Sequence, residues 1–328
     1  MTAASPATVL VTGGAGFIGA NLVRRLLAGG HRVAVVDDLS TGDRGNLTEV
    51  EGRISFHEGT VLDAGVLDAA MAGADAVVHL AARPSVPRSI DDPVATHRAN
   101  ADGTLAVLEA ARRAQGATGG NGPHVLVASS SSVYGANPVL PKSEGLVPQP
   151  RSPYAASKLA AEAYALAYHH SYGLDVLVFR FFNVFGPLQP AGHAYAAVVP
   201  AFVDDALAGR SVTVHGDGTQ TRDFTYVDSV TAVLADAVGR RVVDDQPVNL
   251  AFGTRTDLLG VLARLEALLG HPVERVHAAP RPGDVAHSSA DASRLQALFP
   301  TVEPVDLDAG LAATVAWMRA RRDQGPGA

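Results

Sequence analysis

The sequence predicts an α/β fold in which helices cover both faces of a doubly wound parallel sheet, followed by a smaller, mixed C-terminal lobe. Through residues 1–183, short and continuously apolar runs alternate with segments of helical periodicity. This alternation is typical of parallel strands that are buried on both faces. From residue 184 the alternation stops and loops rich in glycine and proline appear. We therefore expect a sheet domain over 1–183, to which elements near 227–252 return, and a lobe over 184–328.

Each element of the predicted sheet follows from the apolar pattern and its boundary residues. The strands are expected at 9–12, 31–36, 53–57, 76–82, 124–128, 175–179 and 247–251. The helices of the sheet domain are expected at 17–27, 66–71, 93–114 and 152–172, with a glycine-rich loop over 116–123. Ser152 and Pro153 are typical of a helix N-terminus, and Gly173 of its end. In the lobe we expect helices at 196–208, 256–269 and 307–321 and a strand at 212–215.

Composition narrows the class of protein. The 328 residues are 47% apolar and 18% charged, and the net charge of -7 argues against a nucleic-acid partner. Because the chain has no cysteine, it has no disulfide, thiolate nucleophile or cysteine-bound zinc. We see no signal-peptide pattern and no apolar run of roughly 18 residues, so we expect a cytoplasmic protein with no membrane partner.

The first predicted strand enters a glycine-rich turn that begins a helix. Gly14, Gly16 and Gly19 fit the spacing G-x-G-x-x-G, and Gly13, Gly16 and Gly19 fit a related spacing with two residues in each gap. Glycine allows a tight turn and lets the backbone approach a pyrophosphate, which then lies at the positive end of the helix. The sequence therefore predicts a dinucleotide-binding site.

Acidic residues at the end of the second strand indicate which dinucleotide binds. Asp37 lies 18 residues after Gly19 and is followed by Asp38. A carboxylate at this distance is suited to the adenosine ribose hydroxyls and repels a 2′-phosphate, which favours NAD over NADP. Arg44 is near enough in the sequence to oppose this preference.

Tyr154 and Lys158 form the candidate catalytic pair. They are four residues apart on a predicted helix and so project from the same face. A nearby ammonium favours ionisation of the phenol, which makes the tyrosine a better base at neutral pH. The strand at 124–128 ends in four serines, 129–132, one of which can offer a hydroxyl to the same sugar oxygen. Spacing alone does not choose among them.

A series of motifs resembles one known family over nearly the whole chain. The segments are 12–19, 37–42, 79–82, 130–135, 154–158, 180–187, 216–228 and 281–284. Together they are similar to those of the extended short-chain dehydrogenase/reductases, a Rossmann-type group, and specifically to the nucleotide-sugar epimerases and dehydratases. Segments 85–89, 194–200 and 287–291 most resemble the UDP-hexose 4-epimerases.

The resemblance implies a role for individual positions. Ser130 would contact the sugar 4-OH, Tyr154 would be the base, and Lys158 would hold the cofactor ribose and lower the pKa of the tyrosine. NAD would be bound by Gly13, Gly16, Phe17, Ile18, Gly19, Asp37, Asp38, Val61, Leu62, Asp63, Leu80, Ala81, Ala82, Asn100, Tyr154, Lys158 and Phe181. A UDP-sugar would be bound by Ser85, Ser130, Tyr154, Asn183, Val198, Thr213, His215, Arg222, Arg281 and Asp284. A homodimer, formed through the helices near 93–114 and at Tyr154, is also implied.

Departures from the family pattern favour 4-epimerisation of a neutral UDP-hexose. Sugar 4,6-dehydratases usually carry Asp-Glu after the catalytic hydroxyl, where this chain has Ser131 and Ser132. Glucuronate 4-epimerases commonly have arginine where this chain has residues 188–190, although Arg83 could bind a carboxylate. Ser288 is small enough to leave room for a 2-acetamido group.

Two other classes of function stay open. A glucuronate 4-epimerase, or another epimerase or dehydratase of nucleotide sugars, would use the same oxidation at C4. A dinucleotide-sensing protein without catalysis would keep the glycine turn but has no need of Ser130, Tyr154 and Lys158 together. The histidines lack the spacing of metal ligands, so we expect no metal, and His79 is expected to be a packed core residue.

Overall fold

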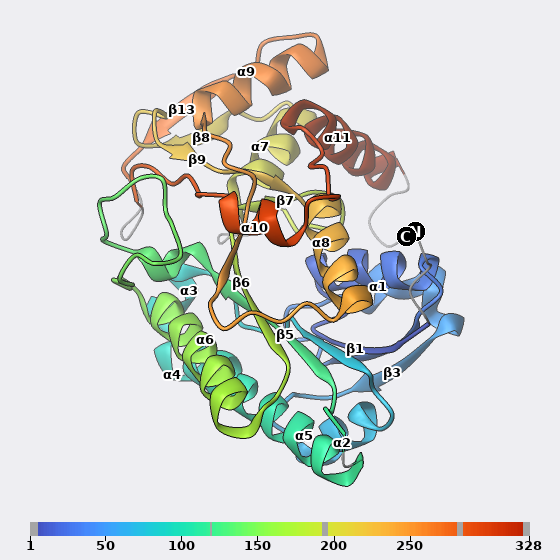
Figure 1. Ribbon diagram of the computed structural model, residues 1–328. Helices are drawn as coiled ribbons and strands as arrows, with labels where there is room; N and C mark the ends of the chain where they lie inside the picture. The colour runs from blue at the N-terminus through green and yellow to red at the C-terminus, as the bar shows by residue number, and fades with distance from the viewer. Residues whose placement is uncertain (1–5, 119, 192–195, 281–284, 324–328) are drawn as a thin grey trace.

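A parallel seven-stranded sheet forms the centre of the protein (Figure 1). The computed structural model describes residues 6–118, 120–191, 196–280 and 285–323. The strands are β1 (Thr8–Thr12), β2 (Arg32–Asp37), β3 (Ile54–Glu58), β4 (Ala76–His79), β5 (His124–Ser130), β6 (Val176–Phe181) and β11 (Val248–Leu250). Their order is β11-β6-β5-β4-β1-β2-β3. From β1 the chain adds β2 and β3 on one side, and it then crosses to β4 and adds the later strands on the other side of β1. The point between β1 and β4 is a topological switch point, and ligands bind at such points.

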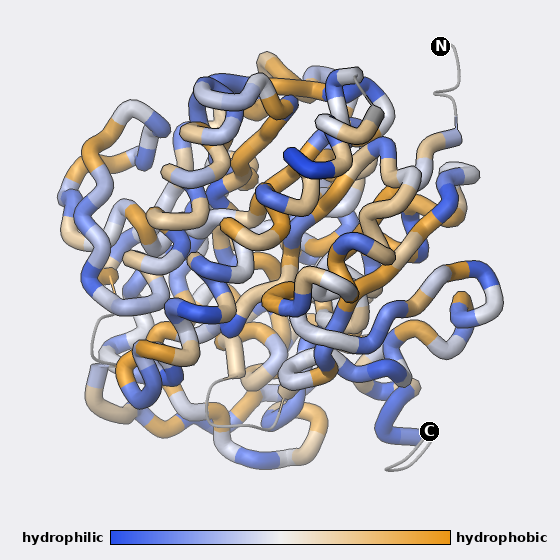
Figure 2. The backbone as a smooth tube through the Cα atoms, turned by 90° about the horizontal axis from the view of Figure 1, so that it is seen from below, coloured by the Kyte–Doolittle hydropathy of each residue, from blue (hydrophilic) through white to orange (hydrophobic). Residues whose placement is uncertain are grey.

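Helices cover both faces of the sheet, which confirms the predicted doubly wound architecture (Figure 1). On one face lie α1 (Phe17–Ala28), α8 (Val227–Arg240) and α10 (Ser293–Leu298). On the other lie α2 (Ala64–Met71), α5 (Gly103–Thr118) and α6 (Pro153–Tyr172). Val9 and Val11 of β1 pack into the first layer and Leu10 into the second, because side chains alternate along a strand. Apolar strands accordingly lie inside the molecule (Figure 2).

The helix expected over 93–114 is present, but it is not α-helical throughout. It consists of α4 (Pro93–His97), a π-helical turn η2 (Arg98–Asp102) and α5, which extends to Thr118. The π-turn shifts the register of the backbone hydrogen bonds, and the Thr104 hydroxyl donates to the Asn100 carbonyl at 2.6 Å. The loop predicted over 116–123 is therefore wrong at 116–118. The strand expected over 76–82 ends at His79, and residues 80–82 leave the sheet.

The C-terminal lobe has its own apolar core, formed mainly by α7, α9 and α11 (top of Figure 1). Its elements are α7 (Val198–Leu207), β8 (Val212–His215), α9 (Leu258–Leu269), β13 (Arg275–Ala278) and α11 (Leu307–Asp323). β13 pairs with β8 in parallel, and the sequence did not predict it because three of its four residues are exposed and show no alternation.

Short elements complete the fold. They are η1 (Arg44–Arg53), α3 (Val86–Asp91), η3 (Ser131–Tyr134), β7 (Val184–Phe185), β9 (Thr221–Arg222), β10 (Thr225–Tyr226) and β12 (Thr256–Asp257). β7 pairs with β10, and β9 pairs with β12. Within the described residues, no helix combines the length and apolar character needed to cross a membrane.

Candidate active site

The glycine turn between β1 and α1 is packed too closely for side chains. Gly13 has a φ of +71°, and a Cβ there would lie 2.7 Å from the Ala81 nitrogen. A Cβ on Gly19 would lie 2.1 Å from the Gly13 oxygen, and one on Gly14 would lie 2.6 Å from Val35 Cγ1. The backbone of the glycine turn therefore packs directly against the loop after β4 and the first turn of α1, with no room for side chains between them. A dinucleotide cradle requires such close packing.

The N-terminus of α1 is available to a phosphate. Gly16 is its N-cap, and no side chain caps the helix. The first backbone N–H groups of a helix carry partial positive charge, and no capping side chain competes for them here. These residues fit the pyrophosphate of a dinucleotide.

Asp37 ties the end of β2 to this turn. Its carboxylate is buried and accepts hydrogen bonds from the Ala15 and Leu39 nitrogens, each at 2.9 Å. Burial raises the pKa of Asp37, although these hydrogen bonds oppose the rise. Each carboxylate oxygen keeps a second lone pair, so both can still accept from ribose hydroxyls. Asp38 is exposed and accepts from the Ser40 nitrogen.

Arg44 is held by other acidic groups and does not pair with Asp37. Its guanidinium lies 2.8 Å from Glu51 Oε1 and 3.5 Å from Glu58 Oε2, and it covers the Phe56 ring at 4.6 Å. The Asp37 carboxylate thus keeps its charge preference for a ribose hydroxyl over a 2′-phosphate.

The remaining residues predicted for the cofactor follow the carboxyl ends of strands. Val61 is buried against Gly103, Leu62 is 46% exposed, and the Asp63 carboxylate caps α2 by accepting from the nitrogens of residues 65 and 66. The half-buried residues of this set are Phe17, Ile18, Leu80, Ala81, Ala82 and Phe181. The capping bond gives Asp63 a local role that the sequence analysis missed.

Asn100 lies in the π-turn and is buried beneath α6. Its Oδ1 accepts from the Arg83 nitrogen at 2.7 Å, and its Nδ2 donates to Ser157 Oγ at 2.9 Å. The Ser157 hydroxyl in turn donates to the Tyr154 carbonyl at 2.8 Å. The Asn100 amide therefore joins the loop after β4 to the first turn of α6. From the sequence we expected Asn100 only to contact the cofactor, and this structural role was not predicted.

The three predicted catalytic residues meet where β5 ends against α6. Lys158 is buried and its Nζ donates to the Ala128 carbonyl at 2.8 Å. Ser130 is hydrogen-bonded to the Tyr154 phenol. Ser130 Oγ accepts from both the nitrogen and the hydroxyl of Ser132, at 3.2 and 2.9 Å. Ser130 is therefore hydrogen-bonded to Ser132 on one side and to Tyr154 on the other.

Burial dominates the electrostatics of this group. It raises the pKa of Tyr154, and the hydrogen bond with Ser130 lowers it in part. Burial also lowers the pKa of Lys158 to about 8. We expected Lys158 to lower the pKa of Tyr154, but in the protein alone burial raises this pKa and only the hydrogen bond with Ser130 opposes the rise.

His79 is a core residue, as predicted. It is 3% exposed and is hydrogen-bonded to the hydroxyls of Thr12 at 2.7 Å and Thr104 at 3.0 Å. Burial first and the Lys158 charge second lower the pKa of His79 to about 3, so the ring is neutral at physiological pH. No group of three metal-ligating side chains occurs in the described parts of the chain.

Glu162 is a residue of this site that the sequence analysis missed. Three successive residues of β5 contact three side chains spaced four apart on α6: the pairs are Ala128–Lys158, Ser129–Glu162 and Ser130–Tyr154. An acidic residue one turn after Lys158, on the same face of an alanine-rich helix, was the available signal.

A cavity of about 230 Å³ lies in the C-terminal lobe, beside the segment that follows β6. Its lining includes five predicted substrate residues: Asn183, Val198, Thr213, His215 and Arg222. The cavity is also lined by residues that were not predicted from the sequence, among them Phe202, Gln220, Phe224 and Leu258. Arg222 Nη1 donates to the Thr221 carbonyl at 2.9 Å, which orients the guanidinium in the wall.

Ser85 is not among the residues that line this cavity. Ser85 follows β4, has a φ of +97°, and caps α3 by accepting from the Arg88 nitrogen. A non-glycine residue in this region of φ is strained and often marks a functional loop. Arg281 and Asp284 lie outside the described residues.

A glycine cradle at the switch point of a doubly wound sheet, together with Tyr154 and Ser130 beside a buried Lys158, defines an extended short-chain dehydrogenase/reductase. A model of the NAD dependent epimerase/dehydratase family matches residues 9–251. The chain belongs to this family, and its cofactor is NAD.

Known proteins are similar to this chain over almost its full length. The UDP-glucose 4-epimerase of Mycolicibacterium smegmatis is 38% identical over 316 residues, covering 94% of this chain and 98% of that protein. The dTDP-glucose 4,6-dehydratase of an Actinoplanes species is 35% identical and covers 96% and 98%. A solved UDP-N-acetylglucosamine 4-epimerase of Methanobrevibacter ruminantium is 34% identical, with a TM-score of 0.88 over 96% of this chain and 99% of that chain.

Replacing Lys158 by methionine should stabilise the cofactor-free protein at pH 7. In the fold the pKa of Lys158 is about 8, whereas unfolded lysine has its ordinary value of 10.5. At pH 7 both states are protonated, so the fold bears the full cost of burying the ammonium. Between pH 8 and 10.5 the unfolded state binds more protons, and the free energy of unfolding of the wild type rises with pH.

We expect Lys158→Met to gain about 1–2 kcal/mol at pH 7, after loss of the hydrogen bond to Ala128. The gain should disappear as the pH approaches 10.5. Urea unfolding of both proteins across this pH range measures the difference. A loss of stability at pH 7 that does not change with pH would contradict the buried-charge explanation.

Proposed function

We propose that the protein is a UDP-hexose 4-epimerase that inverts C4 by transient oxidation to a 4-keto sugar. The observation that carries this proposal is the contact of Ser130 with Tyr154, beside Lys158, at the end of β5. The family supports a nucleotide-sugar substrate, and the M. smegmatis and M. ruminantium relatives support 4-epimerisation.

We also propose the division of the chain and the residues that hold each ligand. Residues 1–183 bind NAD, with elements from 227–252 completing their sheet, and 184–328 mainly bind the nucleotide sugar. NAD contacts Gly13, Gly16, Phe17, Ile18, Gly19, Asp37, Asp38, Val61, Leu62, Asp63, Leu80, Ala81, Ala82, Asn100, Tyr154, Lys158 and Phe181. The sugar nucleotide contacts Ser85, Ser130, Tyr154, Asn183, Val198, Thr213, His215, Arg222, Arg281 and Asp284.

The mechanism follows from the placement of Ser130, Tyr154 and Lys158 at the end of β5. When bound, NAD accepts a hydride from C4 of the sugar and returns it to the opposite face. Tyr154 removes the proton of the 4-OH as a phenolate and gives it back after the sugar has turned. Ser130 binds the same sugar oxygen, and its hydrogen bonds with Ser132 hold its hydroxyl in place. Lys158 supplies the positive charge that favours the phenolate.

The dehydratase alternative lacks an acid and a base for elimination. In place of an acidic pair the chain has Ser131 and Ser132, and Ser132 is hydrogen-bonded to Ser130 at 2.9 Å. A serine hydroxyl is a poor base at neutral pH unless another group deprotonates it. Because the chain is similar to a dTDP-glucose 4,6-dehydratase, the experiment below also looks for the 4-keto-6-deoxy product of dehydration.

The glucuronate alternative needs a cation at the sugar carboxylate. Arg83 is the candidate that the sequence offers, and its Nη1 lies 3.3 Å from Asp92 Oδ2. A substrate carboxylate would have to displace this partner. We therefore favour a neutral hexose.

The decisive experiment supplies nucleotide sugars to the purified protein without added NAD. UDP-glucose, UDP-N-acetylglucosamine and UDP-glucuronate are incubated in turn, and NMR follows the configuration at C4. Inversion at C4 without net consumption of cofactor is expected for one or both neutral sugars. A 4-keto-6-deoxy product, stoichiometric release of reduced cofactor, or no turnover with any nucleotide sugar would overturn the assignment. The last result would favour a dinucleotide-sensing protein.

We propose, in addition, a homodimer formed through the helices near 93–114 and α6. Val94 is 61% exposed and lines an apolar groove with Pro93, Ala156 and Ala160. The alanines leave room for close approach of a second helix pair. Light scattering coupled to size-exclusion chromatography should give twice the chain mass, and Val94→Glu should reduce that mass.

A further inference from the structure

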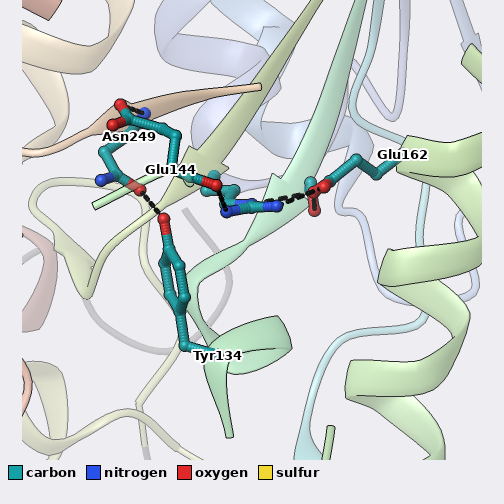
Figure 3. A network of polar contacts seen from close by, with 6 residues as sticks. Tyr134, Glu144, Glu162 and Asn249 are labelled. Carbon is teal, nitrogen blue, oxygen red and sulfur yellow. Dashed lines mark hydrogen bonds and ion pairs between the residues drawn. The ribbon is translucent and has the colours of Figure 1, made fainter. Parts of the chain in front are cut away.

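A buried polar network connects the catalytic helix to the segment that enters the C-terminal lobe (Figure 3). We call it the clamp. Its members are Ser129, Tyr134, Glu144, Glu162, Arg180 and Asn249. The proposed mechanism uses none of these side chains.

The clamp begins at the catalytic helix. Glu162 forms a buried ion pair with Arg180 of β6, whose side chains are 6% and 3% exposed. Arg180 Nε donates to Glu162 Oε2 at 3.0 Å, and the Ser129 hydroxyl donates to the same oxygen, also at 3.0 Å. Ser129 directly precedes Ser130, and Glu162 lies one turn after Lys158. The pair thus holds α6 against β5 and β6 next to both catalytic positions.

From Arg180 the clamp continues towards the lobe. The guanidinium lies 4.7 Å from the centre of the Tyr134 ring and donates to the Glu144 carbonyl at 3.2 Å. The Tyr134 hydroxyl donates to Asn249 Oδ1 at 2.6 Å. The Asn249 backbone nitrogen donates to Glu144 Oε1 at 2.9 Å, which closes the network (Figure 3).

Asn249 is also hydrogen-bonded to the segment 286–291, which we call the strap. Its Nδ2 donates to the Lys142 and Asp291 carbonyls at 2.8 and 3.2 Å. Directly beside Asp291 in the strap, the Ala290 nitrogen donates to the buried Asp223 carboxylate at 3.1 Å. Asp223 is adjacent to Arg222 in the wall of the substrate cavity. A continuous set of hydrogen bonds therefore joins α6 to that wall.

Stability alone is a poor explanation for a buried ion pair. The desolvation of two charges offsets much of their attraction, and apolar replacement of such a pair is often neutral or stabilising. A fully bonded pair does restrict geometry, because each charge loses its partners if either element moves. Here the elements that would move carry Ser130, Tyr154 and Lys158.

We propose that the Glu162–Arg180 pair is a positioning device, which holds the Tyr154 helix in register with the end of β5 and with the strap. Neither residue touches the reacting atoms. Loss of the pair should lower kcat and leave KM for the nucleotide sugar nearly unchanged, since the cavity walls keep their own contacts. The activity readout of this inference depends on the proposed epimerisation, whereas a titration of Tyr154 does not.

The experiment compares three variants with the wild type, all as holoenzymes. Glu162→Gln removes one charge, and the double variant Glu162→Leu/Arg180→Met replaces the pair by apolar side chains. Asp175→Asn is the matched control, because it breaks the Asp175–Arg241 pair at the other end of β6, where Nε and Oδ2 are 2.7 Å apart. Thermal unfolding, kcat and KM are measured, and tyrosinate absorbance is titrated against a Tyr154→Phe background.

The double variant should keep a melting temperature near that of the wild type but lose about 10- to 100-fold in kcat, as misplaced catalytic groups do. Its Tyr154 titration should move to a different midpoint. The control should lose thermal stability and keep kcat. Wild-type kcat with an unchanged titration in the double variant would overturn the proposal. If that variant does not fold, the same comparison is made with Glu162→Gln below its melting temperature.

A wild type that does not epimerise any sugar would overturn the proposed function instead. The titration still decides this inference in that case. An unchanged Tyr154 midpoint in Glu162→Gln would then show that the pair is only structural.

Discussion

Replacing Tyr154 by phenylalanine is expected to lower epimerisation by about 10³- to 10⁴-fold while NAD stays bound. The substitution removes only the hydroxyl, which is hydrogen-bonded to Ser130 and is the base in the proposed mechanism. Proton removal from the 4-OH and hydride loss from C4 are coupled, so neither proceeds without the base. Turnover by NMR and cofactor content by absorbance after denaturation measure the two effects.

Tyr164→Phe is the matched control for this prediction. Tyr164 lies on the same helix and is 43% exposed, so loss of its hydroxyl should leave turnover unchanged. Activity of Tyr154→Phe within about 10-fold of the wild type would mean that another group acts as the base.

Replacing Gly19 by alanine is expected to empty the cofactor site and to destabilise the fold by about 1–3 kcal/mol. The added Cβ would lie 2.1 Å from the Gly13 oxygen, so the turn and the first residues of α1 must separate. That movement displaces the backbone N–H groups that face the pyrophosphate. Cofactor content of the purified protein and its melting temperature give the two readouts.

Gly52→Ala makes the same chemical change where a Cβ meets nothing within 4 Å. It should retain both cofactor and stability. Full NAD occupancy in Gly19→Ala would show that the cradle can relax, and the glycine spacing would then have no steric basis.

Several parts of this structure could be predicted from the sequence because local patterns determine them. The apolar runs of β1, β2 and β5 have the continuous character of strands buried on both faces. Gly13 and Gly19 are required by steric contacts within one short turn. Tyr154 and Lys158 share a face because four residues make about one helical turn.

Other features could not be predicted from the sequence because they depend on tertiary contacts. The periodicity of 93–114 is helical throughout, but the π-turn at Arg98–Asp102 interrupts it. The buried Asn100 in this turn bonds to Arg83 and Ser157, which lie far away in the sequence. No window of the sequence around Asn100 contains those partners.

The sequence by itself determined the fold class, the dinucleotide turn and the helical spacing of the proposed catalytic pair, since each depends on residues within a few positions of one another. Only the tertiary structure decided which serine contacts Tyr154 and how Glu162 is used. It alone brought Asn183, Thr213 and Arg222 around one cavity. These contacts form between residues that are far apart in the sequence, when strands and helices pack together. They are determined by side-chain burial and hydrogen-bond geometry, and sequence spacing does not determine them.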